Sequence, residues 1–279
     1  MSQTNTSQTA FPPIAFIGGG NMASAIIGGL IRQGVPASNI TVVEPFEASR
    51  QALKTQFGID ALPKASDALQ NAQLVVWAVK PQSFKEAAEP VAAFTRNALH
   101  LSVAAGITTE SVAGWTGTQR IVRAMPNTPA LVGKGMTGLF ARPEVDAAGK
   151  ALVEAVIGST GELTWVDKEE HLDAVTALSG SGPAYVFLFL EAMAQAGVDM
   201  GLTAEQSYKL AVATFAGGSE LAARSSESAE VLRQRVTSKG GTTYAAITHM
   251  QENKLPEIFI AAMRKAEARA RELAEEFGK

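Results

Sequence analysis

Short apolar runs alternate with helix-compatible segments through the first half of the 279-residue chain. Short continuous apolar runs are typical of strands buried on both faces of a parallel sheet. The predicted strands are 14–17, 40–44, 74–79, 99–103 and 121–124. The predicted helices between them are 22–33, 47–57, 82–93 and 109–115. This alternation predicts an α/β domain whose parallel sheet has helices on both faces, completed by a strand–helix–strand stretch over 138–166.

The pattern changes after Val166, where helical periodicity continues and no good strand pattern follows. The predicted helices are 169–178, 183–196, 204–223, 229–236, 244–252 and 258–277. We therefore place a boundary near Asp167, between an α/β domain and an all-helical C-terminal domain.

The predicted helix 183–196 is apolar on nearly every face, so we expect it to be buried on nearly every face. A helical domain of about 110 residues rarely surrounds one helix by itself. The sequence thus predicts a subunit interface made by the helical domain. The alternative is a central core helix in a monomer.

Glycines follow the first predicted strand. Gly18, Gly20 and Ala23 fit the dinucleotide-binding fingerprint Gly-x-Gly-x-x-Gly/Ala. In that fingerprint Gly18 allows a tight turn, Gly20 lets the backbone approach a pyrophosphate, and Ala23 lets the helix pack closely on the strand. The helix N-terminus then offers unpaired N–H groups to the anion. A simple glycine turn is the alternative.

These patterns together predict three parts: a disordered lead-in over 1–13, a Rossmann-type dinucleotide-binding domain over 14–166, and a helical domain over 167–279. The lead-in is rich in Ser, Thr and Gln and lacks the charged start and apolar core of a signal peptide. The most apolar later stretch is too short to span a membrane, so a cytoplasmic protein is expected.

Charge and cysteine content narrow the chemistry further. The formal net charge is −3 with no basic block, so a nucleic-acid partner is not expected. The chain has no cysteine, which excludes a disulfide framework, a zinc–thiolate site and cysteine catalysis, and no metal site is predicted.

Glu44 ends the second predicted strand, near the expected spacing from the glycine fingerprint. An acid at this position commonly binds the adenosine ribose hydroxyls of NAD, whereas Arg50 could instead approach a 2′-phosphate. The alternative is that Glu44 only begins the next helix and Arg50 is solvated.

Three further strand ends carry candidate cofactor contacts, because the carboxyl ends of parallel strands line the ligand crevice of such sheets. The candidates are Ala78, Val79, Lys80, Pro81, Val103, Ala104, Ala105 and Asn127. Pro126 and Pro129 hold Asn127 in an extended loop, where its amide could donate and accept near the nicotinamide. Each segment by itself is more often only a turn.

Two motifs in the helical half approach helix N-termini. The segment 178–183 contains two serines, two glycines and a helix-starting proline, although an ordinary cap has the same composition. The segment 236–244 leads from a glycine pair into hydroxyl residues, and successive exposed N–H groups there would form an anion-binding concavity. One small carboxylate is the natural ligand, since no strand and no Gly-Lys-Ser/Thr order indicate a phosphate loop.

Five motifs, taken in order, resemble pyrroline-5-carboxylate reductase. They are Phe-Ile-Gly-Gly-Gly-Asn-Met at 16–22, Ala-Val-Lys-Pro-Gln at 78–82, Arg-Ala-Met-Pro-Asn-Thr-Pro at 123–129, Ala-Val-Thr-Ala-Leu-Ser-Gly-Ser-Gly-Pro-Ala-Tyr at 174–185 and Val-Thr-Ser-Lys-Gly-Gly-Thr-Thr at 236–243. The resemblance runs from Ile14 to the last helix. It implies a helical dimerisation domain, a homo-oligomer built from dimers, and reduction of 1-pyrroline-5-carboxylate to L-proline by NADPH or NADH.

The resemblance also implies roles for individual residues. Cofactor contacts fall on Gly18, Gly19, Gly20, Asn21, Met22, Ala78, Val79, Lys80, Pro81, Val103, Ala104 and Ala105. Substrate contacts fall on Ser238, Gly240, Gly241, Thr242 and Thr243, and loosely on Glu169. The backbone N–H groups of residues 240–243 would hold the carboxylate. Lys239 is not carried over, because many members have proline there. The resemblance favours NADPH, whereas Glu44 argues electrostatically against a 2′-phosphate, so the preference stays open.

The predicted mechanism makes modest demands on the chain, because the cofactor supplies the hydride. Thr243 could hydrogen-bond the product amine or relay a proton, and His100, His171 and His249 are interpreted as structural or surface residues.

One rival function is a β-hydroxyacid dehydrogenase-like or other Rossmann reductase, although Lys209 and Lys239 lack the motif that surrounds the catalytic lysine of that class. The other rival is a nucleotide-sensing protein without turnover, which would require a broken carboxylate turn.

Overall fold

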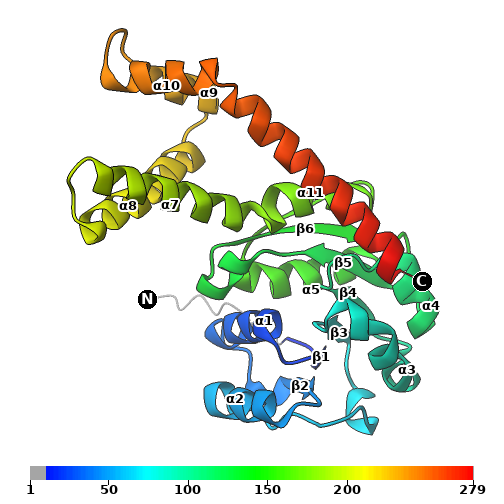
Figure 1. Cartoon of the computed structure of the whole chain (residues 1–279). Coiled ribbons are helices and arrows are strands. Elements are labelled where there is room, and N and C mark those ends of the chain that lie inside the picture. Colours follow the sequence, from blue (N-terminus) through cyan, green and yellow to red (C-terminus); the bar gives the residue numbers. More distant parts are fainter. Residues whose placement is uncertain (1–10, 279) are drawn as a thin grey trace, which may run out of the picture. The chain divides into compact units, whose positions relative to one another are not determined.

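The computed structural model describes residues 11–278. Their contacts divide the chain into two compact units, which Figure 1 shows in sequence colours. The first unit runs to Gly180 and takes in residues 266–278, and the second is Ser181–Lys265.

The first unit is built on one seven-stranded sheet in the order β2-β1-β3-β4-β5-β6-β7. The strands are β1 (Ile14–Ile17), β2 (Ile40–Val43), β3 (Leu74–Trp77), β4 (Leu99–Ser102), β5 (Ile121–Met125), β6 (Gly135–Ala141) and β7 (Gly161–Trp165). The predicted α/β sheet is confirmed, and five of its six strand pairs are parallel.

Strand β6 is the exception, because it pairs antiparallel with β5. The connection over 126–134 holds only the short 3₁₀ helix η4 (Thr128–Val132), and a parallel crossover needs a dozen residues or more. The predicted parallel sheet is therefore mostly parallel, with β6 as its antiparallel strand, and β6 begins at Gly135 rather than at 138.

Helices cover both faces of the sheet, as predicted. They are α1 (Asn21–Arg32), α2 (Glu47–Phe57), α3 (Phe84–Thr95), α4 (Thr109–Thr116) and α5 (Ala147–Ile157), with 3₁₀ helices η1 (Ala37–Asn39), η2 (Asp67–Leu69), η3 (Pro81–Ser83) and η5 (Gly158–Thr160). Successive side chains of each strand point to opposite faces of the sheet and so contribute to two separate hydrophobic cores. In β1, Phe16 joins the core with Ile26 of α1, whereas Ile17 joins the core with Phe84 of α3.

The lead-in expected over 1–13 is partly ordered. Residues 1–10 lie outside the described residues. Residues 11–13 make hydrogen bonds with the first unit: Asn39 donates to the Phe11 carbonyl at 2.9 Å, and the Gln73 N–H donates to the Pro13 carbonyl at 2.9 Å. Phe11 also packs against the core, so these residues tie the chain to the sheet before β1 begins.

The first unit extends beyond the boundary expected near residue 167. Helix α6 (His171–Val175) and the π-helical segment η6 (Thr176–Gly180) belong to it. Leu172 is buried, and the side chains of Leu172 and Val175 lie directly over Gly138 of β6. The compact division therefore falls after Gly180, because the first helix of the predicted helical domain packs on the sheet.

The second unit is helical throughout. It contains α7 (Gly182–Asp199), α8 (Ala204–Arg224), α9 (Ala229–Arg235), α10 (Thr242–Glu252) and the first part of α11 (Leu255–Phe277). Helices α7 and α8 approach closely where Gly197 faces Ser207, since a Cβ at Gly197 would lie 2.5 Å from the Ser207 hydroxyl. Phe189 contacts both Phe215 and Phe259 in a small aromatic cluster.

Helix α7 is poorly covered in the single chain. Only Leu190 and Gly197 of this helix are buried, whereas Phe187 and Leu188 are 59% and 63% exposed. The alternative of a central core helix in a monomer is therefore wrong. Among the described residues, none of the helices combines the length and apolar character needed to cross a membrane.

Candidate functional site

The glycine turn after β1 has the strained geometry that the fingerprint requires. Gly18 has φ +95°, and a Cβ there would lie 2.6 Å from the Ala78 carbonyl oxygen. The Gly18 N–H donates to the Val43 carbonyl at 2.8 Å, which joins the turn to the end of β2. Only glycine satisfies both the positive φ and the close contact with the Ala78 carbonyl, so this turn requires glycine at position 18.

The N-terminus of α1 is open for an anion. Gly20 is the N-cap residue, no side chain caps the helix, and its first turn has no acidic residue. Nothing lies within 4 Å of the position that a Cβ would take at Gly20, and Ala23 is fully buried. The unpaired N–H groups and the free space fit a dinucleotide pyrophosphate.

Glu44 is built into the glycine turn. Its carboxylate accepts from the Gly19 N–H at 2.8 Å and from the Phe46 N–H at 2.9 Å, and the residue is 5% exposed. Arg50 donates to the carbonyls of Glu44 and Pro45 and pairs with Glu47. Glu44 therefore does more than begin helix α2, and Arg50 is not simply solvated.

The other predicted strand ends come to the same edge of the sheet. The Ala78 N–H donates to the Ile17 carbonyl at 2.8 Å, and the Val103 N–H donates to the Trp77 carbonyl at 3.1 Å. The segment 78–81 therefore follows β3 directly beside the glycine turn, and the segment 103–105 follows β4, one strand further along the same edge. This edge is where ligands bind in open α/β sheets.

Asn127 has internal partners rather than a free amide. Its Nδ2 donates to the carbonyl and hydroxyl oxygens of Ser179 at 3.2 and 3.1 Å, and its Oδ1 accepts from the Met136 N–H at 2.9 Å. The amide expected beside the nicotinamide thus holds the end of β5, the start of β6 and segment η6 together.

Glu169 also has a structural setting. Its carboxylate accepts from the Thr109 N–H at 2.7 Å, from the Thr109 hydroxyl at 2.5 Å and from Arg123 Nη1 at 3.1 Å. Arg123 is 5% exposed on β5. Glu169 therefore neutralises a buried guanidinium and binds the start of α4, and these contacts do not suggest the substrate role expected for it.

The sequence analysis did not identify Arg123 and Thr109 as the partners of Glu169, or Ser179 as the partner of Asn127. An arginine inside an otherwise apolar strand is the one available signal, because a buried charge requires a partner. The partners themselves lie far away in the sequence, so no local pattern identifies them.

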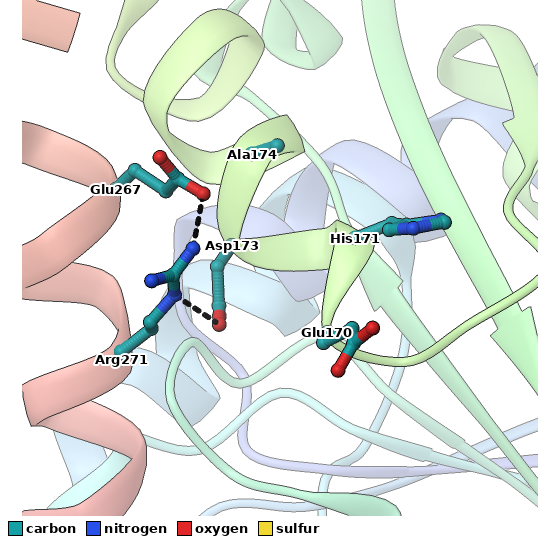
Figure 2. A pocket seen from close by; sticks show the side chains of 6 residues that line it. All are labelled: Glu170, His171, Asp173, Ala174, Glu267 and Arg271. Atoms are coloured by element: carbon teal, nitrogen blue, oxygen red, sulfur yellow. Dashed lines mark hydrogen bonds and ion pairs between the residues drawn. The ribbon is translucent and has the colours of Figure 1, made fainter. Parts of the chain in front are cut away.

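A separate hollow of about 490 Å³ lies between α6 and the end of α11, as Figure 2 shows. Arg271 pairs with Glu267 and lies 4.0 Å from Asp173. Burial raises the pKa of the Asp173 carboxyl, and Arg123 and Arg271 oppose that shift. None of the predicted site residues lines this hollow, so it is not the candidate site.

The segment predicted to bind a carboxylate forms a tight turn that leads into α10 in the second unit. Gly240 has φ +76°, and the Gly241 N–H donates to the Ser238 carbonyl at 3.0 Å. Gly241 is the N-cap of α10, which has no side-chain cap and no acidic residue in its first turn. Thr242 and Thr243 are exposed, and the first N–H groups of α10 have no acceptor within the helix.

None of the three histidines belongs to either turn. His171 and His249 are exposed, whereas His100 is fully buried. Trp77 Nε1 donates to His100 Nδ1 at 3.0 Å, so His100 Nε2 carries the proton and donates to the Thr95 carbonyl at 3.1 Å. Burial lowers the pKa of His100 to about 4, so the ring is neutral at physiological pH.

Comparison with protein families matches both halves of the chain. Residues 13–106 match the family described as NADP oxidoreductase coenzyme F420-dependent, and residues 169–273 match the family described as pyrroline-5-carboxylate reductase dimerisation. The second match begins close to the boundary expected near residue 167, although the compact unit begins later.

Individual relatives match along nearly the whole chain. The pyrroline-5-carboxylate reductase of Pseudomonas aeruginosa is 42% identical over 96% of this chain and 98% of that protein. The structure of the Coxiella burnetii pyrroline-5-carboxylate reductase is 40% identical, with a TM-score of 0.89 over 95% of this chain and 99% of that one. The Plasmodium falciparum pyrroline carboxylate reductase with NADP bound is 26% identical, with a TM-score of 0.83 over 95% and 99%.

Proposed function

The chain belongs to the pyrroline-5-carboxylate reductase family, and from this premise we propose which of its residues carry out the reaction. The reaction reduces the C=N bond of 1-pyrroline-5-carboxylate to L-proline at the expense of NADPH or NADH. The single observation that carries the proposal is the full-length family match, and the uncapped N-termini of α1 and α10, without acidic residues in their first turns, support it.

The first turn is proposed to hold the cofactor. The pyrophosphate of the cofactor would lie against the N–H groups of Asn21 and Met22, in the space in front of Gly20. The segments 78–81 and 103–105 would line the remainder, and the bound cofactor supplies the hydride. Open space at Gly20 and an uncapped helix support this assignment.

The second turn is proposed to hold the substrate carboxylate. The backbone N–H groups from Gly240 to Thr243 form an uncapped helix N-terminus with no acidic side chain in its first turn. Such a terminus favours a single negative charge without offering a group that would react with the imine. A small ring acid anchored there is oriented through its carboxylate, and positioning of this kind can contribute on the order of 7–11 kcal/mol.

Thr243 is the residue we assign to the ring nitrogen. Its hydroxyl can both donate and accept a hydrogen bond, so it can stabilise the product amine or relay a proton. It is exposed beside the carboxylate turn, where a bound ring would place its nitrogen. Glu169 and Asn127 are left out of this assignment, because their polar atoms already have partners within the chain.

The family match to a dimerisation domain indicates a homo-oligomer. We propose dimers joined through the exposed apolar face of α7, since Phe187 and Leu188 otherwise face solvent. The expected location is the cytoplasm.

The test is a spectrophotometric assay of NADPH and NADH oxidation with 1-pyrroline-5-carboxylate, beside a panel of β-hydroxyacids assayed in the oxidative direction. Turnover with the pyrroline alone is expected. Thr243→Ala should lower kcat/KM by about 10²-fold or more, and Thr243→Ser should restore most of it. Turnover of a hydroxyacid, or cofactor binding without turnover of either class, would contradict the proposal.

A further inference from the structure

Charged side chains lie at the end of β2, beside the glycine turn. In dinucleotide-binding sheets this position meets the adenosine ribose, where NADH has a 2′-hydroxyl and NADPH has a 2′-phosphate. Two acidic side chains and one basic side chain lie here: Glu44, Glu47 and Arg50. Their arrangement bears on which of the two cofactors the chain binds more tightly.

Glu44 is fixed in place as an acceptor. Two backbone N–H groups, those of Gly19 and Phe46, each donate to one of its carboxylate oxygens. A carboxylate has about four lone-pair positions, so each oxygen keeps one for a ribose hydroxyl. Because Glu44 is only 5% exposed, its charge is little screened and cannot swing away from an approaching anion.

Arg50 is the base that a 2′-phosphate would require, and it is already engaged. Its Nη1 donates to the carbonyls of Glu44 at 3.0 Å and Pro45 at 2.7 Å, and its Nη2 pairs with the Glu47 carboxylate. Hydrogen bonds from Gln51 and Arg50 lower the pKa of the Glu47 carboxyl, so Glu47 stays ionised at neutral pH. Lys54, on the next turn of α2, pairs with Asp60 at 2.7 Å.

Two carboxylates and one guanidinium leave this place with a net negative charge. A 2′-phosphate would bring further negative charge to it, whereas a 2′-hydroxyl can donate to Glu44. Resting on the proposed function, we propose that Glu44 and Glu47 set the cofactor specificity of this chain, so that it binds NADH more tightly than NADPH. The expected ratio of dissociation constants is about tenfold, a modest value for a charge repulsion at this degree of burial.

The experiment measures binding rather than turnover. The full-length protein is titrated with NADH and NADPH in the absence of substrate, by calorimetry or by nicotinamide fluorescence. Adenosine 5′-monophosphate and adenosine 2′,5′-bisphosphate serve as fragments that differ only in the 2′ group. Tighter binding of NADH and of the monophosphate is expected, and the opposite order in either pair would overturn the inference.

Two variants assign the effect to these residues. Glu44→Gln removes the buried charge, and Glu47→Gln removes the exposed one and releases Arg50. Each should shift the affinity ratio toward NADPH by about tenfold. Glu47 is 64% exposed, so its variant keeps the test valid if the glycine turn collapses in Glu44→Gln.

Glu162→Gln is the matched control, because Glu162 is exposed on β7 at the opposite edge of the sheet from β2. Its ratio should equal that of the parent protein. If the ratio of the NADH and NADPH dissociation constants were unchanged in both test variants, Glu44 would only stabilise the glycine turn, and the inference would be overturned. Preferred binding of NADH without any pyrroline turnover would support the inference while refuting the proposed function, so the two failures are distinguishable.

Discussion

The two units of this chain differ in how completely they bury their apolar side chains. The sheet unit has apolar residues buried to 0–2% exposure on both faces, among them Phe16, Leu101 and Trp77. In the helical unit, Leu190 and Ala211 are the buried apolar residues among those described, and Phe187, Leu188 and Leu221 are 59–70% exposed. The first unit closes its core within one chain, whereas the second leaves apolar surface uncovered.

The two anion-binding turns differ in the same way. The glycine turn after β1 is joined to β2 and β3 by backbone contacts, and Glu44 holds it from the side. The turn at Gly240 has an internal bond from Gly241 to Ser238, and Thr242 and Thr243 are exposed. The glycine turn is therefore fixed by contacts within its own unit, and we expect the turn at Gly240, which is proposed to bind the substrate, to gain contacts only in the oligomer.

The largest expected effect comes from charging the uncovered face of α7. Leu188→Glu would place an unpaired carboxylate in the proposed interface, at a cost of about 3–5 kcal/mol and roughly a thousandfold in the dimer dissociation constant. Light scattering at micromolar concentration should show that this variant is a monomer. The spectrophotometric assay should show that it has little activity. Leu188→Met, which keeps the surface apolar, should stay oligomeric; a dimeric Leu188→Glu protein would place the interface elsewhere.

The glycine turn gives the next effect and separates folding from binding. Gly18→Ala forces a Cβ to 2.6 Å from the Ala78 carbonyl at positive φ, which should destabilise the protein by about 2–5 kcal/mol. Gly20→Ala meets no atom within 4 Å and should keep the parent Tm while weakening cofactor binding. Thermal melts and cofactor titration measure the two effects, and a lowered Tm with normal binding in Gly20→Ala would contradict this account.

His100 makes the closed core sensitive to acid. Its folded-state pKa is lowered from 6.5 to about 4, so the unfolded chain binds the extra proton first as the pH falls. Stability is complete above pH 6.5 and declines between pH 6.5 and about 4, by up to about 3 kcal/mol from this group. Denaturant unfolding at several pH values should show a weaker decline in His100→Gln, and parallel curves for the two proteins would rule out the effect.

The smallest effect is expected at Glu169 and tests where the substrate binds. Glu169→Gln weakens the contacts with Arg123 and Thr109, at a cost of about 1–2 kcal/mol. Because the residue is assigned to the scaffold, Tm should fall while the KM for the pyrroline stays near the parent value. A raised KM with an unchanged Tm would return Glu169 to the substrate site.

Local patterns predict the elements of this fold well. Helix α2 and strand β1 have the predicted bounds, because a continuous apolar run and a helical period are visible within each segment. The antiparallel β6 was not predicted, since its direction depends on the short connection through η4.

Side-chain partners could not be predicted in the same way. Asn127 meets Ser179 and Glu169 meets Thr109 and Arg123, over separations of 46 to 60 residues that no local pattern encodes. The sequence indicates that these residues are special without indicating whether a ligand or the chain itself satisfies them. For Asn127 and Glu169 the chain itself supplies the partners.

The central claim is that one turn holds the cofactor and the other presents the substrate to it within the assembled oligomer. A crystal structure of the oligomer with NADPH or NADH and proline tests it most directly. The account predicts the proline carboxylate on the N–H groups of residues 240–243, with its C5 about 3–3.5 Å from the nicotinamide C4 of one of the subunits. A carboxylate bound elsewhere, or a turn at 240–243 remote from every nicotinamide in the assembly, would contradict it.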